Sequence, residues 1–217
     1  MRDYGGKSGD ERRAERRARL ITAGLELFGT QGFAATSVRA LLREAGLQER
    51  YFAESFASMD ELLAAVYDQA HAAVFNEIAR TRDPSAPPME QLRRGVDALA
   101  RTLESDLRSA RVMCFEVIDA GPLVQEHRRR AIAKYAATME SMMPPLHPDR
   151  GLDREAVASA LIAGLNGLVL DWWAKRLSLT RDDVVEHAML LIRGVVREAS
   201  AAPEESYAPE QQPQMLV

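Results

Sequence analysis

Hydrophobic and polar positions alternate at helical spacing along most of the chain, and short runs rich in glycine or proline separate the periodic segments. Between residues 33 and 56 the pattern predicts two short helices joined by a tight turn. Longer helices are predicted at about residues 11–29, 58–78, 89–107, 110–120, 123–143, 153–177 and 180–199. Strand signals are nearly absent, and no internal repeat is found. The pattern therefore predicts an all-α fold.

The two short helices have the features of a helix-turn-helix. Thr36 and Ser37 offer hydroxyls that can cap the first helix, and Gly46 ends it, because glycine enters the left-handed conformation without steric cost. Phe52 and Phe56, one turn apart, are expected to face inward from the second helix. Its outward positions are Glu49, Arg50, Tyr51 and Ser55. Such a second helix enters the major groove of DNA, although an ordinary helical hairpin remains the alternative.

The flanking segments favour the DNA-binding interpretation. The preceding helix has an apolar face that includes Leu20 and Phe28. After the second short helix, Ser58 and Glu61 have the spacing of a capping box, which predicts the start of a long helix there.

With these segments the chain resembles the TetR family of bacterial transcriptional regulators. The resemblance covers roughly residues 17–67, through LITAGLELFGTQGFAATSVRALLREAGL and the run F-x-S-x-x-E-L-L from Phe56 to Leu63. Residues 80–217 carry no family-wide motif. The resemblance implies a three-helix helix-turn-helix DNA-binding domain, followed by a C-terminal helical domain for ligand binding and dimerisation.

We accordingly expect a DNA-binding domain at residues 1–57, with residues 1–10 as a disordered arm. The ligand-binding and dimerisation domain is expected at residues 58–200. Residues 201–217 contain three prolines with paired glutamates and glutamines, which is typical of a disordered tail.

Candidate DNA contacts lie on both short helices. Thr36, Ser37 and Arg39 are placed to hold phosphates, and Arg50 and Tyr51 are candidates for contacts with base edges. Gln48, Glu49 and Ser55 complete the candidate set. A dimer with one such helix per subunit would bind double-stranded DNA at an inverted-repeat operator.

The chain departs from the family pattern at several of the positions expected to contact DNA. The family usually has a serine where this chain has Gln48, a tyrosine at the position of Ala53 and a lysine at the position of Met59. Glu49 and Glu54 add negative charge beside a polyanion. These departures motivate an alternative function, a helical ligand-binding or interaction protein with weakened DNA affinity.

Charge is unevenly distributed along the chain. The formal net charge is −4, but residues 1–50 hold ten Arg or Lys against seven Asp or Glu, which leaves −7 for the rest. The densest run comprises the arginines at positions 12, 13, 16, 17 and 19. A basic N-terminal part on an acidic body is consistent with DNA binding at one end, although the arginine run can also be a solvated helix start.

The last two predicted helices indicate a dimer. The segment at 153–177 is apolar nearly all round, so it must be covered on every side, and a second copy of the chain is the expected cover. The alternative is a core helix inside a monomer. The expected interface residues are Ala160, Gly164, Gly167, Leu168, Leu191, Ile192, Val195 and Val196.

The middle helices are expected to hold a small-molecule effector, because the family keeps its inducer site there. Expected apolar contacts are Leu99, Leu103, Met113, Phe115, Val117, Ile118, Tyr135 and Met139. Glu116, Asn166 and Trp172 are the candidates for orienting the effector. The composition predicts a hydrophobic or amphipathic effector, unless the whole set is simply core.

No catalytic or metal-binding pattern is found. His71, His127, His147 and His187 are scattered, so no metal, cofactor or enzymatic activity is expected. Cys114 lies in an apolar run and is expected to be a buried thiol. We identify neither a signal peptide nor an apolar run near the length of a membrane span, and expect a cytoplasmic protein. The overall expectation is a dimeric repressor released by its effector.

Overall fold

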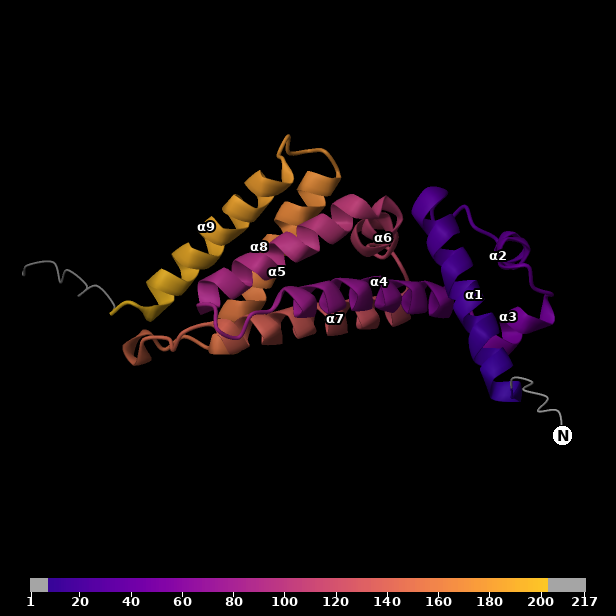
Figure 1. Ribbon diagram of the computed structural model, residues 1–217, viewed down its shortest axis with the longest axis horizontal. Helices are drawn as coiled ribbons and strands as arrows, with labels where there is room; N and C mark the ends of the chain where they lie inside the picture. Colours follow the sequence, from indigo (N-terminus) through magenta and orange to yellow (C-terminus); the bar gives the residue numbers. More distant parts are fainter. Residues whose placement is uncertain (1–7, 203–217) are drawn as a thin grey trace, which may run out of the picture.

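The computed structural model describes residues 8–202, and in this part of the chain all regular secondary structure is helical, without strands, as expected (Figure 1). The N-terminal helices are α1 (Gly9–Thr30), α2 (Val38–Ala45), α3 (Arg50–Ser55) and α4 (Met59–Thr81). They are followed by α5 (Pro88–Ser105), α6 (Leu107–Arg111), the π-helix η1 (Val112–Glu116) and α7 (Pro122–Met142). A 3₁₀ turn, η2 (Pro148–Arg150), precedes α8 (Arg154–Trp173) and α9 (Arg181–Ser200).

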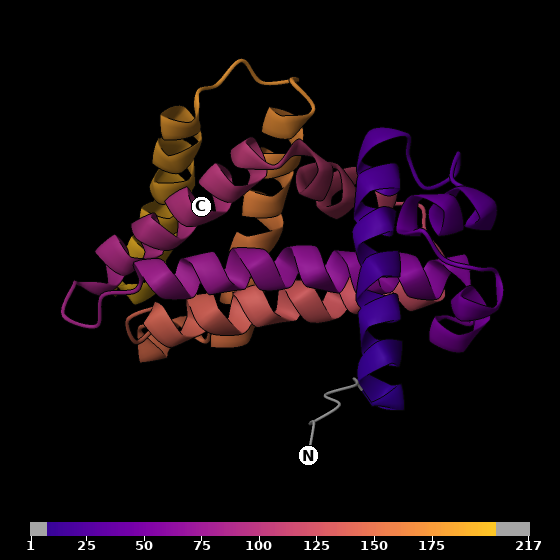
Figure 2. The same ribbon diagram turned by 45° about the vertical axis from the view of Figure 1, so that its right-hand side comes forward.

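The molecule is elongated, with α1, α2 and α3 gathered at one end (Figure 1). Helix α4 leaves this end and runs along the body beside α7, while α5 packs against both α4 and α9 (Figure 2). Helix α8 packs against α7 and α9. The long α4 is therefore a direct structural connection between the N-terminal unit and the body.

One hydrophobic core joins the N-terminal unit to the body. It contains buried side chains of α1, α2 and α3, such as Leu20, Leu41 and Phe52, together with the first half of α4. Three valines, Val112, Val117 and Val124, enter the same core from η1, α7 and the segment between them. The expected boundary after residue 57 thus lies inside a continuous core. A second core lies among α5, α7, α8 and α9.

The start of the chain differs from expectation. Ser8 caps α1 and forms a reciprocal capping box with Glu11, so residues 8–10 belong to the ordered helix rather than to a disordered arm. Residues 1–7 of the expected arm lie outside the described residues. The same holds for residues 203–217 of the expected tail, since only Ala201 and Ala202 are described.

The predicted helix at 110–120 is wrong in both its start and its form. Asp106 caps α6, which begins at Leu107, and from Val112 the chain continues as a π-helix that ends at Glu116. A π-turn adds a residue per turn and changes the direction in which the following side chains point.

Helix α8 also differs from expectation. Within residues 8–202 it is the helix that is long and apolar enough to cross a membrane, with a mean hydropathy of 1.4. Only 17% of this span is buried in the chain. A large part of its apolar surface is therefore left uncovered by the described part of the molecule.

Candidate functional site

Local backbone bonds and one arginine of α1 fix the first short helix of the N-terminal unit. The hydroxyl of Ser37 caps α2, and Gly46 ends it in the left-handed region at φ 61°. From α1, Arg19 Nη2 donates to the carbonyl oxygens of Ala45, at 2.5 Å, and Gly46, at 3.1 Å. This arginine thus caps the end of α2 instead of projecting freely into solvent.

The second short helix, α3, begins without a side-chain cap, since neither Gln48 nor Glu49 provides one. The rings of Phe52 and Phe56 are buried with their centroids 6.1 Å apart, which anchors the inner face. Without a cap, packing of these two rings is the main support of a helix too short to be stable by itself.

Tyr51 lies between two arginines on the outer side of α3. The guanidinium carbons of Arg16 and Arg50 lie 4.5 and 4.8 Å from the centroid of its ring. Arg50 Nη2 also donates to the Tyr51 hydroxyl at 2.8 Å. Arg16 in addition pairs with Glu54 at 3.1 Å, so an arginine of α1 offsets the negative charge within α3.

Several predicted DNA contacts lie exposed on this unit. They are Ser37, Arg39, Gln48, Glu49 and Arg50. Thr36 is different, because its side chain is buried and its hydroxyl donates to the carbonyl oxygen of Gly32 at 2.8 Å. The hydroxyl of Ser55 is also buried, with no partner in the described part of the chain. Thr36 and Ser55 therefore do not present their hydroxyls to DNA in this conformation.

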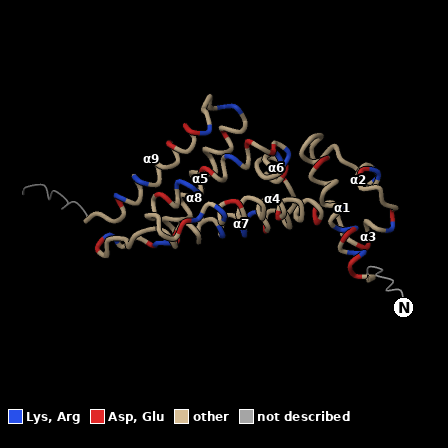
Figure 3. The backbone as a smooth tube through the Cα atoms, in the orientation of Figure 1, with Lys and Arg blue, Asp and Glu red and all other residues tan. Residues whose placement is uncertain are grey.

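Basic and acidic positions are interspersed along α1 and α3 (Figure 3). Besides Arg16 and Arg19, Arg17 is held in the chain, with its guanidinium 4.6 Å from the centroid of the Phe56 ring. These three arginines of the run therefore stabilise the packing of α1 on α2, α3 and Phe56, which together we call the reading unit, and they are more than a solvated helix start.

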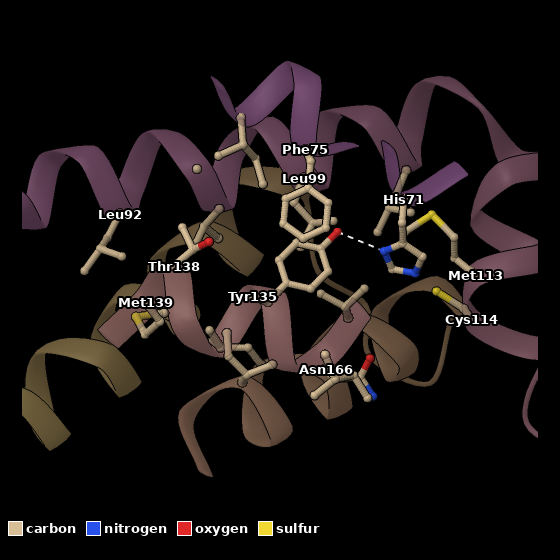
Figure 4. Close-up of a pocket in the computed structure, with 18 of the residues that line it drawn as sticks. His71, Phe75, Leu92, Leu99, Met113, Cys114, Tyr135, Thr138, Met139 and Asn166 are labelled. Atoms are coloured by element: carbon tan, nitrogen blue, oxygen red, sulfur yellow. Dashed lines mark hydrogen bonds between the residues drawn. The ribbon is translucent and has the colours of Figure 1, made fainter. Parts of the chain in front are cut away.

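The body contains a cavity between α4, α5, η1, α7 and α8 (Figure 4). Its volume open to the centre of a water-sized sphere is about 140 Å³. One water needs roughly 10–15 Å³ by the same measure, so the cavity has room for a small organic molecule. The predicted residues that line it are Leu99, Leu103, Met113, Tyr135, Met139 and Asn166.

The other predicted effector contacts lie elsewhere. Phe115 is turned towards α8 by the π-helix and packs on Trp173, with ring centroids 4.7 Å apart. Val117 is buried in the N-terminal core, and Ile118 is 45% exposed. The Trp172 indole N–H donates to the carbonyl oxygen of Leu179 at 3.0 Å, so this group is already paired within the chain.

Helix α4 supplies contacts that the sequence reasoning missed. Tyr67, His71 and Phe75 lie at intervals of four residues along α4, and all three line the cavity. Arg128 and Ile132 line it from α7. The aromatic spacing on α4 was a usable signal, but it is also the pattern of an ordinary core stripe.

The polar centre of the cavity is a histidine–tyrosine pair. His71 Nδ1 lies 3.0 Å from the Tyr135 hydroxyl, and the Tyr135 ring stacks on Phe75 with centroids 4.2 Å apart (Figure 4). Burial lowers the pKa of His71 to about 4, so the imidazole is neutral at pH 7. Its other nitrogen, Nε2, is buried without a hydrogen-bond partner in the described chain.

Two further ionisable groups of the cavity are also neutral. Burial raises the pKa of Tyr67 well above its usual value, an effect that the positive charge of Arg128 partly offsets. Burial likewise raises the pKa of the Cys114 thiol to about 12. The expectation that Cys114 is a buried thiol is confirmed.

The segment η1 joins the cavity to the N-terminal unit. Met113 and Cys114 line the cavity, and the carboxylate of Glu116 accepts a bond from the Phe33 backbone N–H at 2.6 Å. Arg111 Nε donates to the same carboxylate at 2.7 Å, and Arg111 Nη1 donates to the carbonyl oxygen of Thr30 at 2.8 Å. Glu116, predicted as an effector contact, instead anchors the turn after α1.

The expected dimer residues divide into two groups. Ala160, Gly164 and Gly167 are exposed on α8, and Leu191 is 38% exposed on α9. Ile192 and Val196 are instead buried in the C-terminal core, because that face of α9 packs inside the chain. Val195 packs partly buried against this core, and Leu168 against the small cluster around Trp172. The surface available to a partner therefore consists mainly of small residues of α8 and the outer face of α9.

Comparisons with known proteins agree with this architecture. The family model described as bacterial regulatory proteins, tetR family, matches residues 20–66. Among curated proteins, no sequence matches the chain significantly.

Several solved structures have the same fold. A TetR-like transcriptional regulator from Rhodococcus sp. RHA1 is 22% identical, with 83% of this chain and 95% of that chain covered and a TM-score of 0.62. The fatty acid degradation regulator FadR from Bacillus halodurans is 14% identical over 88% of this chain and 97% of that chain, with a TM-score of 0.66. The multidrug binding protein EbrR, solved with imidazole, is 22% identical over 81% and 94%, with a TM-score of 0.64.

At these identities the structural likeness shows the fold, while the family model identifies the N-terminal unit. The matched unit is that of bacterial regulatory proteins, and the solved structures that share the fold include TetR-like transcriptional regulators. The helix-turn-helix of α2 and α3 is accordingly the DNA-binding element of a unit that matches the tetR family of bacterial regulatory proteins, and the chain as a whole has the fold of TetR-like regulators.

Proposed function

We propose that the protein is a dimeric, cytoplasmic repressor that releases its operator when a small hydrophobic or amphipathic effector fills the cavity. The observation that carries this proposal is the position of η1. Met113 and Cys114 form part of the cavity wall, and two residues after Cys114 the carboxylate of Glu116 holds the backbone of Phe33 beside the helix-turn-helix. A ligand that displaces η1 would therefore act on the reading unit directly.

The second route from the cavity is α4. Tyr67 and His71 line the cavity, while Leu62 and Leu63, about one to two turns earlier on α4, are fully buried in the N-terminal core. A ligand shifts the regulator only if it binds one conformation more tightly, and a coupling of about 1–3 kcal/mol is sufficient.

The exposed face of α8 supports the dimer. Small side chains at Ala160, Gly164 and Gly167 permit close approach of another helix, and the apolar span of α8 is only 17% buried in the chain. A symmetric pair would cover this face in both copies and bring two α3 helices to an inverted repeat with half-sites one turn, or a small multiple, apart.

The test is a gel shift with purified full-length protein on the DNA that flanks its own gene, at several salt concentrations. We expect specific binding that weakens steeply with salt, and release when an effector is added. Ligand binding without any DNA binding would favour the alternative, a helical ligand-binding protein that has lost its DNA affinity. Two observations support this alternative, namely the uncapped start of α3 and the exposed Glu49.

A further inference from the structure

The polar groups of the cavity that lack a hydrogen-bond partner or a counter-charge lie towards one end of it. Tyr67 lies on the half of α4 that leads to the N-terminal unit, His71 lies at the middle of α4, and Arg128 lies on the first half of α7. At the opposite end Leu92 and Met139 are well separated from His71 (Figure 4), and the two polar side chains there, Gln91 and Thr138, already donate to backbone carbonyl oxygens. A ligand that matches this wall has one polar end and an apolar body.

The groups at the polar end lack partners within residues 8–202. His71 Nε2 is buried and unpaired, and neither the Tyr67 hydroxyl nor the Arg128 guanidinium makes a hydrogen bond or ion pair there. The next two arginines of α7 behave differently, since Arg129 and Arg130 both bind Glu126 on the outside of the molecule. Arg128 is therefore the member of this arginine triplet that faces the cavity without a carboxylate.

At this end of the cavity the side chains offer hydrogen-bond donors to a ligand. If the Tyr135 hydroxyl donates to His71 Nδ1, only one donor, Nε2–H, is left unsatisfied. The opposite tautomer leaves both Nε2 and the Tyr135 hydroxyl hydrogen unpaired, which is less favourable in a buried site. Arg128 adds a fixed positive charge, and no Asp or Glu is among the described residues that line the cavity.

We propose that the cavity binds an amphipathic monoanion whose carboxylate pairs with Arg128 and accepts hydrogen bonds from Tyr67 and His71, while its apolar body extends towards Leu92 and Met139. A single guanidinium balances a single negative charge. A dianion such as a phosphate monoester would leave one charge unpaired in an otherwise apolar cavity, and an organic cation would be repelled. This assignment deepens the proposed function, because it takes the cavity as the effector site.

The probes are dodecanoate, dodecanol and dodecyltrimethylammonium, each below its micelle concentration. They share an apolar chain and differ in the charge of the head group. Binding to the full-length protein is measured by calorimetry and by the shift of thermal unfolding. We expect dodecanoate to bind most tightly and the cation to bind least.

Variants of Arg128 test whether its guanidinium binds the negative head group. Arg128→Gln should weaken dodecanoate binding roughly 10- to 100-fold while leaving dodecanol binding within a few-fold. Arg128→Lys should retain much of the preference for the anion. The matched control is Arg130→Gln, since Arg130 lies two residues away and pairs on the surface with Glu126. Circular dichroism of each variant verifies that it is folded.

The outcomes are distinct. Equal binding of dodecanoate and dodecanol, no binding of either, or an unchanged affinity in Arg128→Gln would each overturn the anion assignment. If dodecanoate binds through Arg128 but leaves the operator complex intact, the anion site stands and the proposed release mechanism is wrong. If only dodecanol or the cation releases DNA, the release mechanism stands and the anion assignment is wrong.

Discussion

The carboxylate of Glu116 accepts a hydrogen bond from the backbone N–H of Phe33, 83 positions earlier in the chain, with 2.6 Å between Oε2 and N. Because Phe33 opens the segment that leads into the helix-turn-helix and Glu116 ends the π-helix at the cavity, this bond connects the two parts of the regulator. The side chain of Glu116 is only 13% exposed, so the carboxylate needs the partners that it has.

Glu116→Gln should reduce the free energy of unfolding by about 1–3 kcal/mol. The amide keeps an acceptor for Phe33 but loses the charge that binds Arg111. Denaturant unfolding of the variant and of Asp119→Asn, a control at an exposed residue three positions away, measures the effect. If the two variants are equally stable, the bond is not a significant connection.

Gly167→Leu should weaken the dimer by overpacking, by about 1–3 kcal/mol or roughly 5- to 150-fold in the dimer dissociation constant. Within the chain, a Cβ atom at Gly167 would meet nothing within 4 Å, so the fold of the subunit should tolerate the change. Gly164→Leu would also disturb the subunit itself, because its Cβ would lie 3.1 Å from Leu191 Cδ2 of the same chain.

Light scattering over a range of concentrations measures the change in Gly167→Leu. Ala133→Leu, at an exposed position on α7, is the matched control for an added leucine. An unchanged dimer in Gly167→Leu would exclude this part of α8 from the interface.

The fold class and the reading unit could be predicted because their signals are local. Gly46 needs a left-handed backbone whatever surrounds it, and the spacing of Phe52 and Phe56 defines the inner face of α3 within a single helix. The capping position at Ser58 is equally local, although Glu61 reaches back to the N–H of Ala57 rather than to that of Ser58.

Other features depend on long-range packing and could not be read from the pattern. Ile192 and Leu191 are adjacent apolar residues, and only the packing of α9 on the rest of the chain decides that Ile192 is buried while Leu191 is exposed. The π-helix likewise turns Phe115 towards Trp173, whereas Met113 faces the cavity. In the sequence His71 is an isolated histidine, because its partner Tyr135 lies 64 positions away.

Arg50→Ala should cost about 1–3 kcal/mol in operator binding and relax sequence specificity if Arg50 contacts base edges. Arg50 is exposed and bonds the Tyr51 hydroxyl, so Tyr51→Phe tests whether this bond orients the guanidinium. Affinities are measured on operator and random DNA at the same salt concentration, with Arg80→Ala, on the distant end of α4, as the control. Equal weakening on both DNAs would instead assign Arg50 to a phosphate.

His71 should make stability depend on pH below neutrality. Its pKa is about 4 in the folded protein, against 6.5 for an unperturbed histidine, so the unfolded chain binds the proton first as the pH falls. The contribution of the neutral imidazole is fully present above pH 6.5 and is lost progressively towards pH 4, by on the order of 3 kcal/mol. His71→Phe, which has no titrating group, should lose this part of the pH dependence, whereas His187→Gln, at an exposed position, should retain it. Unfolding free energies of the three proteins between pH 7 and pH 4 provide the measurement, and parallel curves for wild type and His71→Phe would show that burial of His71 does not govern acid stability.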